Sequence, residues 1–143
     1  MTKPHVFFLC THNSARSQMA EGFLRALAGE RFEVASAGTE STRVHPLAIR
    51  AMEEIGIDLS GHTSKTIDAL LGQPWNYVIT VCNSASQRCP VFPGRTTRIH
   101  WGFEDPSKAT GTEEERLQTF RLVRDQLIAR IREWVADLER STP

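Results

Sequence analysis

The chain has 143 residues, of which 40% are hydrophobic, and its 17 lysine and arginine residues balance its 17 aspartate and glutamate residues. This length suits a single domain over residues 1–143, and the balanced charge excludes a basic surface for nucleic acid or for an anionic membrane. Because no apolar stretch is long enough for a signal segment or a membrane span, we expect a cytoplasmic protein, and nothing in the sequence requires more than a monomer.

Segments typical of strands alternate with segments typical of helices along the whole chain. The strand-like segments are 5–9, 32–37, 77–81 and 96–101, and the helical patterns are 17–28, 46–55, the stretch around Ser84 and the C-terminal region. Strand followed by helix, repeated in this way, predicts a parallel sheet that is covered on both faces. We therefore expect an α/β fold, a single-domain three-layer sandwich with a central four-stranded parallel sheet.

The C-terminal helix has the clearest sequence pattern. Thr112 and Glu115 have the spacing of a capping box, in which the two side chains satisfy the first free N–H groups of a helix. Hydrophobic residues then recur every three or four positions and predict one buried stripe. The stripe consists of Leu117, Phe120, Val123, Leu127, Ile131, Trp134 and Leu138. We assign it to the core and place no site there.

Three segments are predicted to meet at one edge of the sheet. Cys10 and Cys82 each directly follow a predicted strand, and the segment 102–111, GFEDPSKATG, follows the fourth. The carboxyl ends of parallel strands lie along one edge of a sheet, and ligands bind there. We therefore expect one site built from these three segments.

The first of these segments, CTHNSARS, has the composition of an anion-binding loop. Backbone N–H groups at a helix N-terminus attract a tetrahedral oxyanion, and Arg16 offers a planar fork for two of its oxygens. Asn13 tolerates the left-handed backbone that a tight loop needs. The same field lowers the pKa of a thiol below its usual value of about 8.5, so Cys10 is the predicted nucleophile, assisted by the hydroxyls of Ser17 and Ser14. The predicted oxyanion-binding residues are Thr11, His12, Asn13, Ser14, Ala15, Arg16 and Ser17.

Each of these features also has a simpler interpretation. Cys10 could be a buried structural cysteine and Arg16 an ordinary helix-start arginine, and a loop histidine such as His12 is more often a solvated side chain than a catalyst. Three cysteines, an odd number in a reducing compartment, favour thiol chemistry or metal binding over structural disulfides. A zinc site completed by His100 would need closer cysteine spacing than C-x6-C, so we expect no metal site. Inert packing of the second and third cysteines is the other alternative.

The segment CTHNSARSQMAEG resembles the catalytic loop of low-molecular-weight protein tyrosine phosphatases, and more closely that of the thioredoxin-coupled arsenate reductases that share their fold. The segments HTSK, VCNSASQRCPVFPG and HWGFEDPSKATGTEEE resemble arsenate reductase segments in the same order, so the resemblance covers nearly the whole chain. It implies that Asp105 is the general acid, although an aspartate before Pro106 is otherwise a common turn residue. Many relatives have Gly and Cys where this chain has His12 and Ala15.

The resemblance implies a relay of thiols that reduces arsenate to arsenite. Cys10 would attack arsenate while Arg16 holds its oxygens and Asp105 protonates the leaving oxygen. Cys82 would then attack Cys10, and thioredoxin would reduce the resulting Cys82–Cys89 disulfide. Because a continuous helix would separate these last two α-carbons by about 10 Å and a disulfide tolerates about 7 Å, the segment between them is expected to rearrange. No cofactor is expected to be tightly bound, and phosphate or sulfate should compete with arsenate.

Other functions stay open at this stage. A tyrosine phosphatase or phosphomonoesterase would need only Cys10, and weak phosphatase activity could accompany reduction. A redox sensor or oxyanion-binding protein without turnover would not need an acid at Asp105. Some relatives bind a monovalent cation near the loop and have an acidic side chain where this chain has Lys65, so this lysine either supplies the positive charge or is simply solvated. The electron donor could also be a glutaredoxin-type partner.

Overall fold

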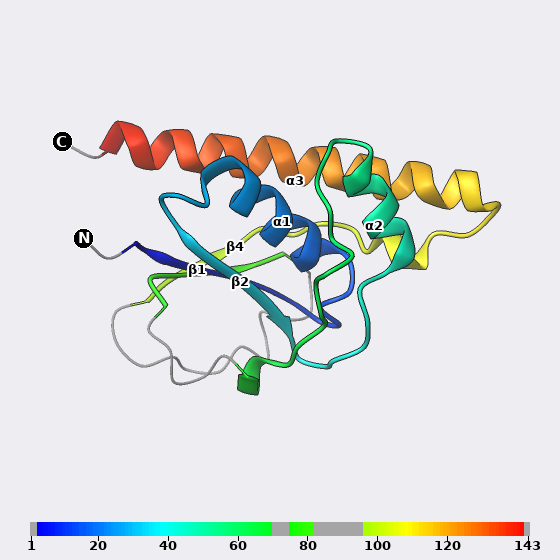
Figure 1. The fold of residues 1–143 in the computed structure, drawn as a ribbon, viewed down its shortest axis with the longest axis horizontal. Helices are drawn as coiled ribbons and strands as arrows, with labels where there is room; N and C mark the ends of the chain where they lie inside the picture. The colour runs from blue at the N-terminus through cyan, green and yellow to red at the C-terminus, as the bar shows by residue number, and fades with distance from the viewer. Residues whose placement is uncertain (1–2, 70–74, 82–95, 142–143) are drawn as a thin grey trace.

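The centre of the molecule is a four-stranded parallel sheet in the order β2-β1-β3-β4 (Figure 1). The computed structural model describes residues 3–69, 75–81 and 96–141. The strands are β1 (His5–Cys10), β2 (Glu33–Gly38), β3 (Tyr77–Thr80) and β4 (Thr97–His100). The four predicted strands are confirmed to within one residue at each end. β1 lies inside the sheet, and its last residue, Cys10, pairs with Gly38 of β2.

Helices α1 and α3 lie on one face of the sheet, with α2 beside them (Figure 1). The helical elements are α1 (Arg16–Ala28), α2 (Pro46–Glu53), α3 (Glu113–Ser141) and the short 3-10 turns η1 (Ile67–Ala69) and η3 (Pro106–Lys108). The expected α/β class with a central four-stranded parallel sheet is confirmed. The stretch around Ser84, expected to be helical, lies outside the described residues, so the layer on the other face stays a prediction.

The core forms around β1. Residues 6–9 are 0% exposed, as expected for an inner strand of a parallel sheet, which is buried on both faces and has a continuous apolar sequence. On the side of α3, the ring of Trp134 lies 5.2 Å from Tyr77 and 6.1 Å from Trp101, measured between centroids. Cys10 is therefore presented at the end of a rigid, fully packed strand.

The long helix α3 begins and packs as its sequence pattern predicts. Thr112 Oγ1 accepts a hydrogen bond from Glu115 N at 3.1 Å, and Glu115 Oε1 accepts one from Thr112 N at 3.2 Å, which confirms the capping box. Of the predicted stripe, Leu117, Phe120, Val123, Leu127 and Ile131 are buried, and Trp134 and Leu138 are partly buried against the core. In the described ranges, no helix combines the length and apolar character that crossing a bilayer requires.

Candidate active site

The loop at residues 10–16 joins the end of β1 to the start of α1. The segment that follows β2 holds its backbone. Glu40 N donates to the carbonyl oxygen of Thr11, and His45 N donates to that of Ser14, each at 2.9 Å. The parallel register explains these contacts, because pairing at the ends of β1 and β2 places the two following segments side by side.

Gly38 allows the loop and β2 to approach closely. A Cβ atom at this position would lie 2.6 Å from the carbonyl oxygen of Thr11 and 2.7 Å from Asn13 N, closer than real Cβ contacts. Asn13 has a φ of 49°, which confirms the left-handed backbone predicted for it. A missing side chain on one segment and an unusual backbone conformation on the other therefore shape the loop together.

The thiol of Cys10 has a hydroxyl partner. Its Sγ lies 2.7 Å from Ser17 Oγ, in the first turn of α1. Asn13 Nδ2 donates to Ser17 Oγ at 2.8 Å and to Ser36 Oγ at 2.9 Å. Since Ser17 Oγ already accepts from Asn13, its own hydrogen is available to the sulfur, and this donation favours the thiolate.

A second set of contacts fixes the orientation of the Asn13 amide. Its Oδ1 accepts hydrogen bonds from Gln18 Nε2 and from the backbone N of Lys65, both at 2.8 Å. These two donors identify this atom as the oxygen, so the amide nitrogen must face the serines. The side-chain ammonium of Lys65 donates instead to the carbonyl oxygen of Thr63 at 3.1 Å. Its proposed role in place of a cation stays a prediction.

The polar network under the loop ends at a buried carboxylate. Ser36 Oγ donates to Glu21 Oε1 at 2.5 Å, and Arg25 Nη2 pairs with Glu21 Oε2 at 2.6 Å. Glu21 is only 5% exposed, so this pairing compensates the cost of burying its charge. Within the described residues, every buried side-chain nitrogen and oxygen has a hydrogen-bond partner. The layer that supports the loop is therefore fully satisfied and should be rigid.

Arg16 connects the loop to the segment after β4. Its Nη1 donates to the carbonyl oxygen of Phe103 at 3.0 Å, and its Nη2 lies 3.5 Å from Asp105 Oδ2. Asp105 also caps η3, because its Oδ1 accepts from Ser107 N at 3.0 Å and from Ser107 Oγ at 2.7 Å. Burial acts to raise the pKa of Asp105, but the hydrogen bonds from Ser107 and the charge of Arg16 outweigh it, and the pKa is lowered.

Two adjoining hollows mark where a ligand would bind. The smaller is lined by Cys10, His12, Ser14, Ala15, Arg16, Asp105 and Ser107. The larger, of about 530 Å³, is lined by Thr11, His12, Arg16, Gly102, Phe103, Glu104, Asp105 and Lys108. The segments after β1 and β4 therefore meet, as predicted. The third expected segment begins at Cys82, and both Cys82 and Cys89 lie outside the described residues.

The zinc alternative is not tested, because two of its three ligands, Cys82 and Cys89, lie outside the described residues. His100 Nδ1 is hydrogen-bonded to Thr80 Oγ1 at 2.5 Å. Among the residues that the structure describes, no group of three or more histidine, cysteine, aspartate or glutamate side chains could hold a metal ion.

Several residues at the site were not predicted from the sequence. Gln18 orients Asn13, Phe103 provides a wall and a carbonyl acceptor, and Glu40 pairs with His12. Of these residues, Glu40 follows from the pairing of β1 with β2. Cys10 pairs with Gly38, and continuing this register by two residues places position 12 beside position 40.

Similar proteins are known for nearly the full length of the chain. Residues 5–143 match the family model described as Low molecular weight phosphotyrosine protein phosphatase. An arsenate reductase of Halalkalibacterium halodurans is 50% identical over 132 residues, which cover 92% of this chain and 95% of that protein. A solved structure described as an arsenate reductase in oxidized state matches with a TM-score of 0.80 and 38% identity, covering 93% of this chain and 97% of that one. A thioredoxin-dependent arsenate reductase of Corynebacterium glutamicum matches with a TM-score of 0.73 and 28% identity, covering 98% of this chain and 64% of that one.

Proposed function

This chain belongs to the low molecular weight phosphotyrosine protein phosphatase family, and from this premise we propose that it reduces arsenate to arsenite with Cys10 as the nucleophile. The observation that carries the proposal is that Cys10, Arg16 and Asp105 line one small hollow, in a chain half identical to an arsenate reductase. A thiol supported by a hydroxyl, a guanidinium fork and a carboxyl group are the three groups that attack on a tetrahedral oxyanion requires.

In the first step, the Cys10 thiolate attacks arsenic, and a bond between sulfur and arsenic forms. A hydroxyl oxygen of arsenate leaves as water after it takes a proton from Asp105. Without an anion, Arg16 and Ser107 keep Asp105 ionised. An oxyanion bound to Arg16 offsets the positive charge beside this carboxyl and places negative charge near it, so binding should itself promote protonation of Asp105.

In the second step, arsenic gains two electrons from a pair of thiols. The Cys82 thiolate attacks Cys10 Sγ, a disulfide forms, and the electron pair of the broken sulfur–arsenic bond stays on arsenic, which leaves as arsenite. Cys89 then attacks Cys82, which frees Cys10 and leaves a Cys82–Cys89 disulfide for thioredoxin to reduce. The roles of these two cysteines are supported by their presence in the sequence, and the role of thioredoxin by the thioredoxin-dependent relative.

Hydrolysis of phosphate esters is a second candidate activity. The cavity of about 530 Å³ beside the loop is larger than an inorganic oxyanion needs, and Phe103 forms part of its wall. A small ester group would fit there while the phosphate occupies the loop. Water would then release the phosphate from Cys10, with no need for a second thiol.

A coupled assay tests the proposed function. We would supply arsenate, thioredoxin, thioredoxin reductase and NADPH, and compare the wild type with Cys82→Ser and Cys89→Ser variants. Both variants should lose NADPH consumption and should keep any hydrolysis of p-nitrophenyl phosphate, whereas Cys10→Ser should lose both activities. NADPH consumption that survives in both variants would contradict the thiol relay.

A further inference from the structure

We propose that His12, oriented by Glu40, is a proton-linked contact for the bound oxyanion, so that anion binding takes up a proton at this imidazole. The inference rests on the proposed oxyanion site and adds a specificity-determining residue to it. It does not depend on which reaction follows binding, so it can be tested apart from arsenate reduction.

The position of His12 is the first observation. His12 is among the residues that line both the small hollow at Cys10 and the larger cavity beside it. Its Nε2 lies 3.1 Å from Glu40 Oε2, and the backbone of Glu40 is tied to the same loop through Thr11. A carboxylate at this distance favours a hydrogen on Nε2. The ring is therefore held close to Glu40, at the edge of the site.

The second observation concerns Nδ1, the other nitrogen of the His12 ring. Within the described part of the chain, His12 Nδ1 has no hydrogen-bond partner. When the neutral ring has its hydrogen on Nε2, beside Glu40, it has a lone pair on Nδ1. Protonation converts this acceptor into a donor, which can bind an oxyanion in the loop. The charge of this side chain is thus coupled to occupancy of the site.

The signs of the neighbouring charges determine the direction of the effect. The other charged groups around His12 are Arg16, Glu40, Glu104, Asp105 and Lys108, with Arg43 further along the segment after β2. Glu40 is the acidic group nearest to the ring, and Arg16 is a positive charge at the same hollow. A bound dianion offsets Arg16 and adds negative charge, so the ring should hold its proton to higher pH in the complex than in the free protein.

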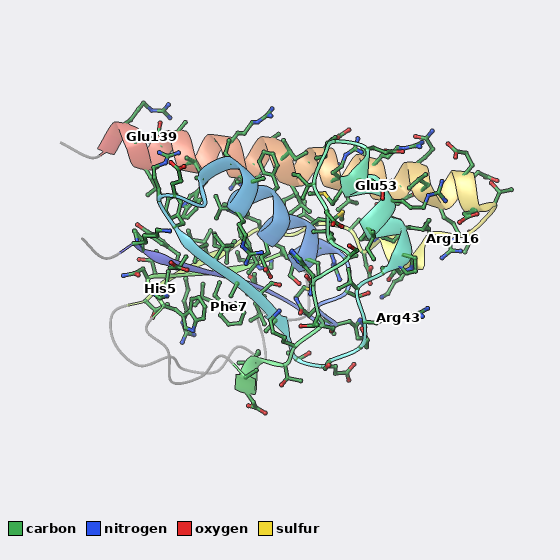
Figure 2. All side chains as sticks on the ribbon, viewed as in Figure 1. His5, Phe7, Arg43, Glu53, Arg116 and Glu139 are labelled. Carbon is green, nitrogen blue, oxygen red and sulfur yellow. The ribbon has the colours of Figure 1, made fainter. Side chains whose placement is uncertain are left out.

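His45, on the segment after β2 that also carries Glu40, is not expected to take up a proton when the anion binds. Burial, followed by the charges of Arg116 and Arg43, lowers the pKa of His45. Its Nδ1 accepts a hydrogen bond from Leu47 N, which requires an unprotonated nitrogen. Figure 2 shows Arg43 and Arg116 at the end of the molecule opposite His5.

Sulfate binding to a Cys10→Ser protein tests the inference. Sulfate stays a dianion between about pH 5.5 and 8, where His changes charge, and the substitution removes the titrating thiol. Calorimetry in two buffers of different ionisation enthalpy measures the protons taken up. We expect uptake of up to about half a proton per sulfate near neutral pH, which is what a tenfold change in affinity requires. The affinity should be highest at low pH and fall about tenfold as pH rises through this range.

Three further substitutions in the same background complete the design. His12→Gln should lose the proton uptake near neutral pH, and any uptake that remains, at more acidic pH, belongs to Asp105. Glu40→Gln should shift the change in affinity to lower pH, because the carboxylate that favours the imidazolium is gone. His5→Gln, at the start of β1, is the matched histidine control and should behave like its parent.

Two results would overturn the inference. One is sulfate binding to the parent without proton uptake, or no binding at all. The other is a pH dependence that persists unchanged in both His12→Gln and Glu40→Gln. A protein that hydrolyses phosphate esters and does not reduce arsenate would still show the linked proton, so failure of the proposed function is distinguishable from failure here.

Discussion

Cys10 is 2% exposed, and burial by itself disfavours a thiolate. Two features of its surroundings act in the opposite direction. The N-terminus of α1 provides a favourable field, and the hydroxyl of Ser17 is placed to donate, because Asn13 already occupies one acceptor position on that oxygen. The reactivity of the thiol should therefore depend strongly on Ser17.

Replacing Ser17 with alanine should raise the pKa of Cys10, because the thiolate loses a hydrogen bond, and a hydrogen bond to a charged group is worth about 1.5 kcal/mol. The pH dependence of alkylation by iodoacetamide measures this pKa. Cys82→Ser and Cys89→Ser in the background leave Cys10 as the sole thiol. Ser41→Ala, which removes an exposed loop hydroxyl, is the control. The same alkylation profile in Ser17→Ala and its parent would exclude this role for the hydroxyl.

Asp105→Asn should slow formation of the adduct on Cys10 at least about 100-fold, because the leaving oxygen loses its proton donor. Rapid-mixing measurement of arsenate-dependent thiol loss gives this rate, with Asp125→Asn, an exposed carboxyl group on α3, as control.

The same variant makes a prediction about stability. The folded-state pKa of Asp105 lies below its ordinary value of 3.8, so the ionised carboxylate stabilises the fold above about pH 4. This contribution is lost as pH falls through the folded-state pKa. Acid unfolding should therefore depend less steeply on pH in Asp105→Asn than in the wild type. An identical steepness in both proteins would show that the carboxylate gains no stabilisation in the fold.

At the level of elements, the active-site loop depends on how closely β2 approaches it. Gly38→Ala would place a methyl group 2.6 Å from the carbonyl oxygen of Thr11. The backbone must then move, at a cost of about 1–3 kcal/mol in the free energy of unfolding, and the loop loses its shape. We expect a lower Tm together with weaker sulfate binding. Gly61→Ala is the matched control, because its Cβ would meet nothing within 4 Å. Equal sulfate affinity in both variants would contradict the role of Gly38.

A charge cluster joins α2 to α3. Hydrogen bonds from Arg121, then from Arg124, lower the pKa of Glu54 from 4.5 to about 2, against the effect of burial. The stabilisation is present above about pH 4.5 and is lost as pH falls toward 2. Because these side chains are partly exposed, Glu54→Gln should cost only about 1 kcal/mol or less at neutral pH.

Chemical denaturation at several pH values measures this cost. The neighbouring Glu53, labelled in Figure 2, provides the control variant Glu53→Gln. If the free energies of unfolding of Glu54→Gln and the wild type still differed by the same amount at pH 2, ionisation of Glu54 would not be the source of the stabilisation.

At the scale of the whole molecule, most of the architecture was predictable from the sequence because its signals are local. The apolar run of β1, the capping box at Thr112 and the stripe along α3 each lie within one element. The buried polar side chains beneath the active-site loop were harder to predict from the sequence. Gln18 is polar and on a helix, so a solvated position was the natural expectation, yet it is 0% exposed. Its burial depends on how α1 packs beneath the loop, which no local pattern reports.

The same distinction applies within the candidate site. Cys10 and Arg16 lie in one short segment, so their spacing, together with the position of this segment between a strand and a helix, predicted a shared anion. The carbonyl oxygen of Phe103 that accepts from Arg16, and the carboxylate that pairs with His12, come from distant segments. They meet the loop only because the parallel sheet brings the ends of its strands to one edge.

A single turnover without any external reductant tests whether the three cysteines form a thiol relay. Fully reduced protein is mixed with excess arsenate, and arsenite, free thiols and disulfide-linked peptides are then measured. The thiol relay predicts one arsenite per chain, one remaining thiol at Cys10 and a disulfide between Cys82 and Cys89. No arsenite, with all three thiols of the chain still free, would contradict it and leave a hydrolase.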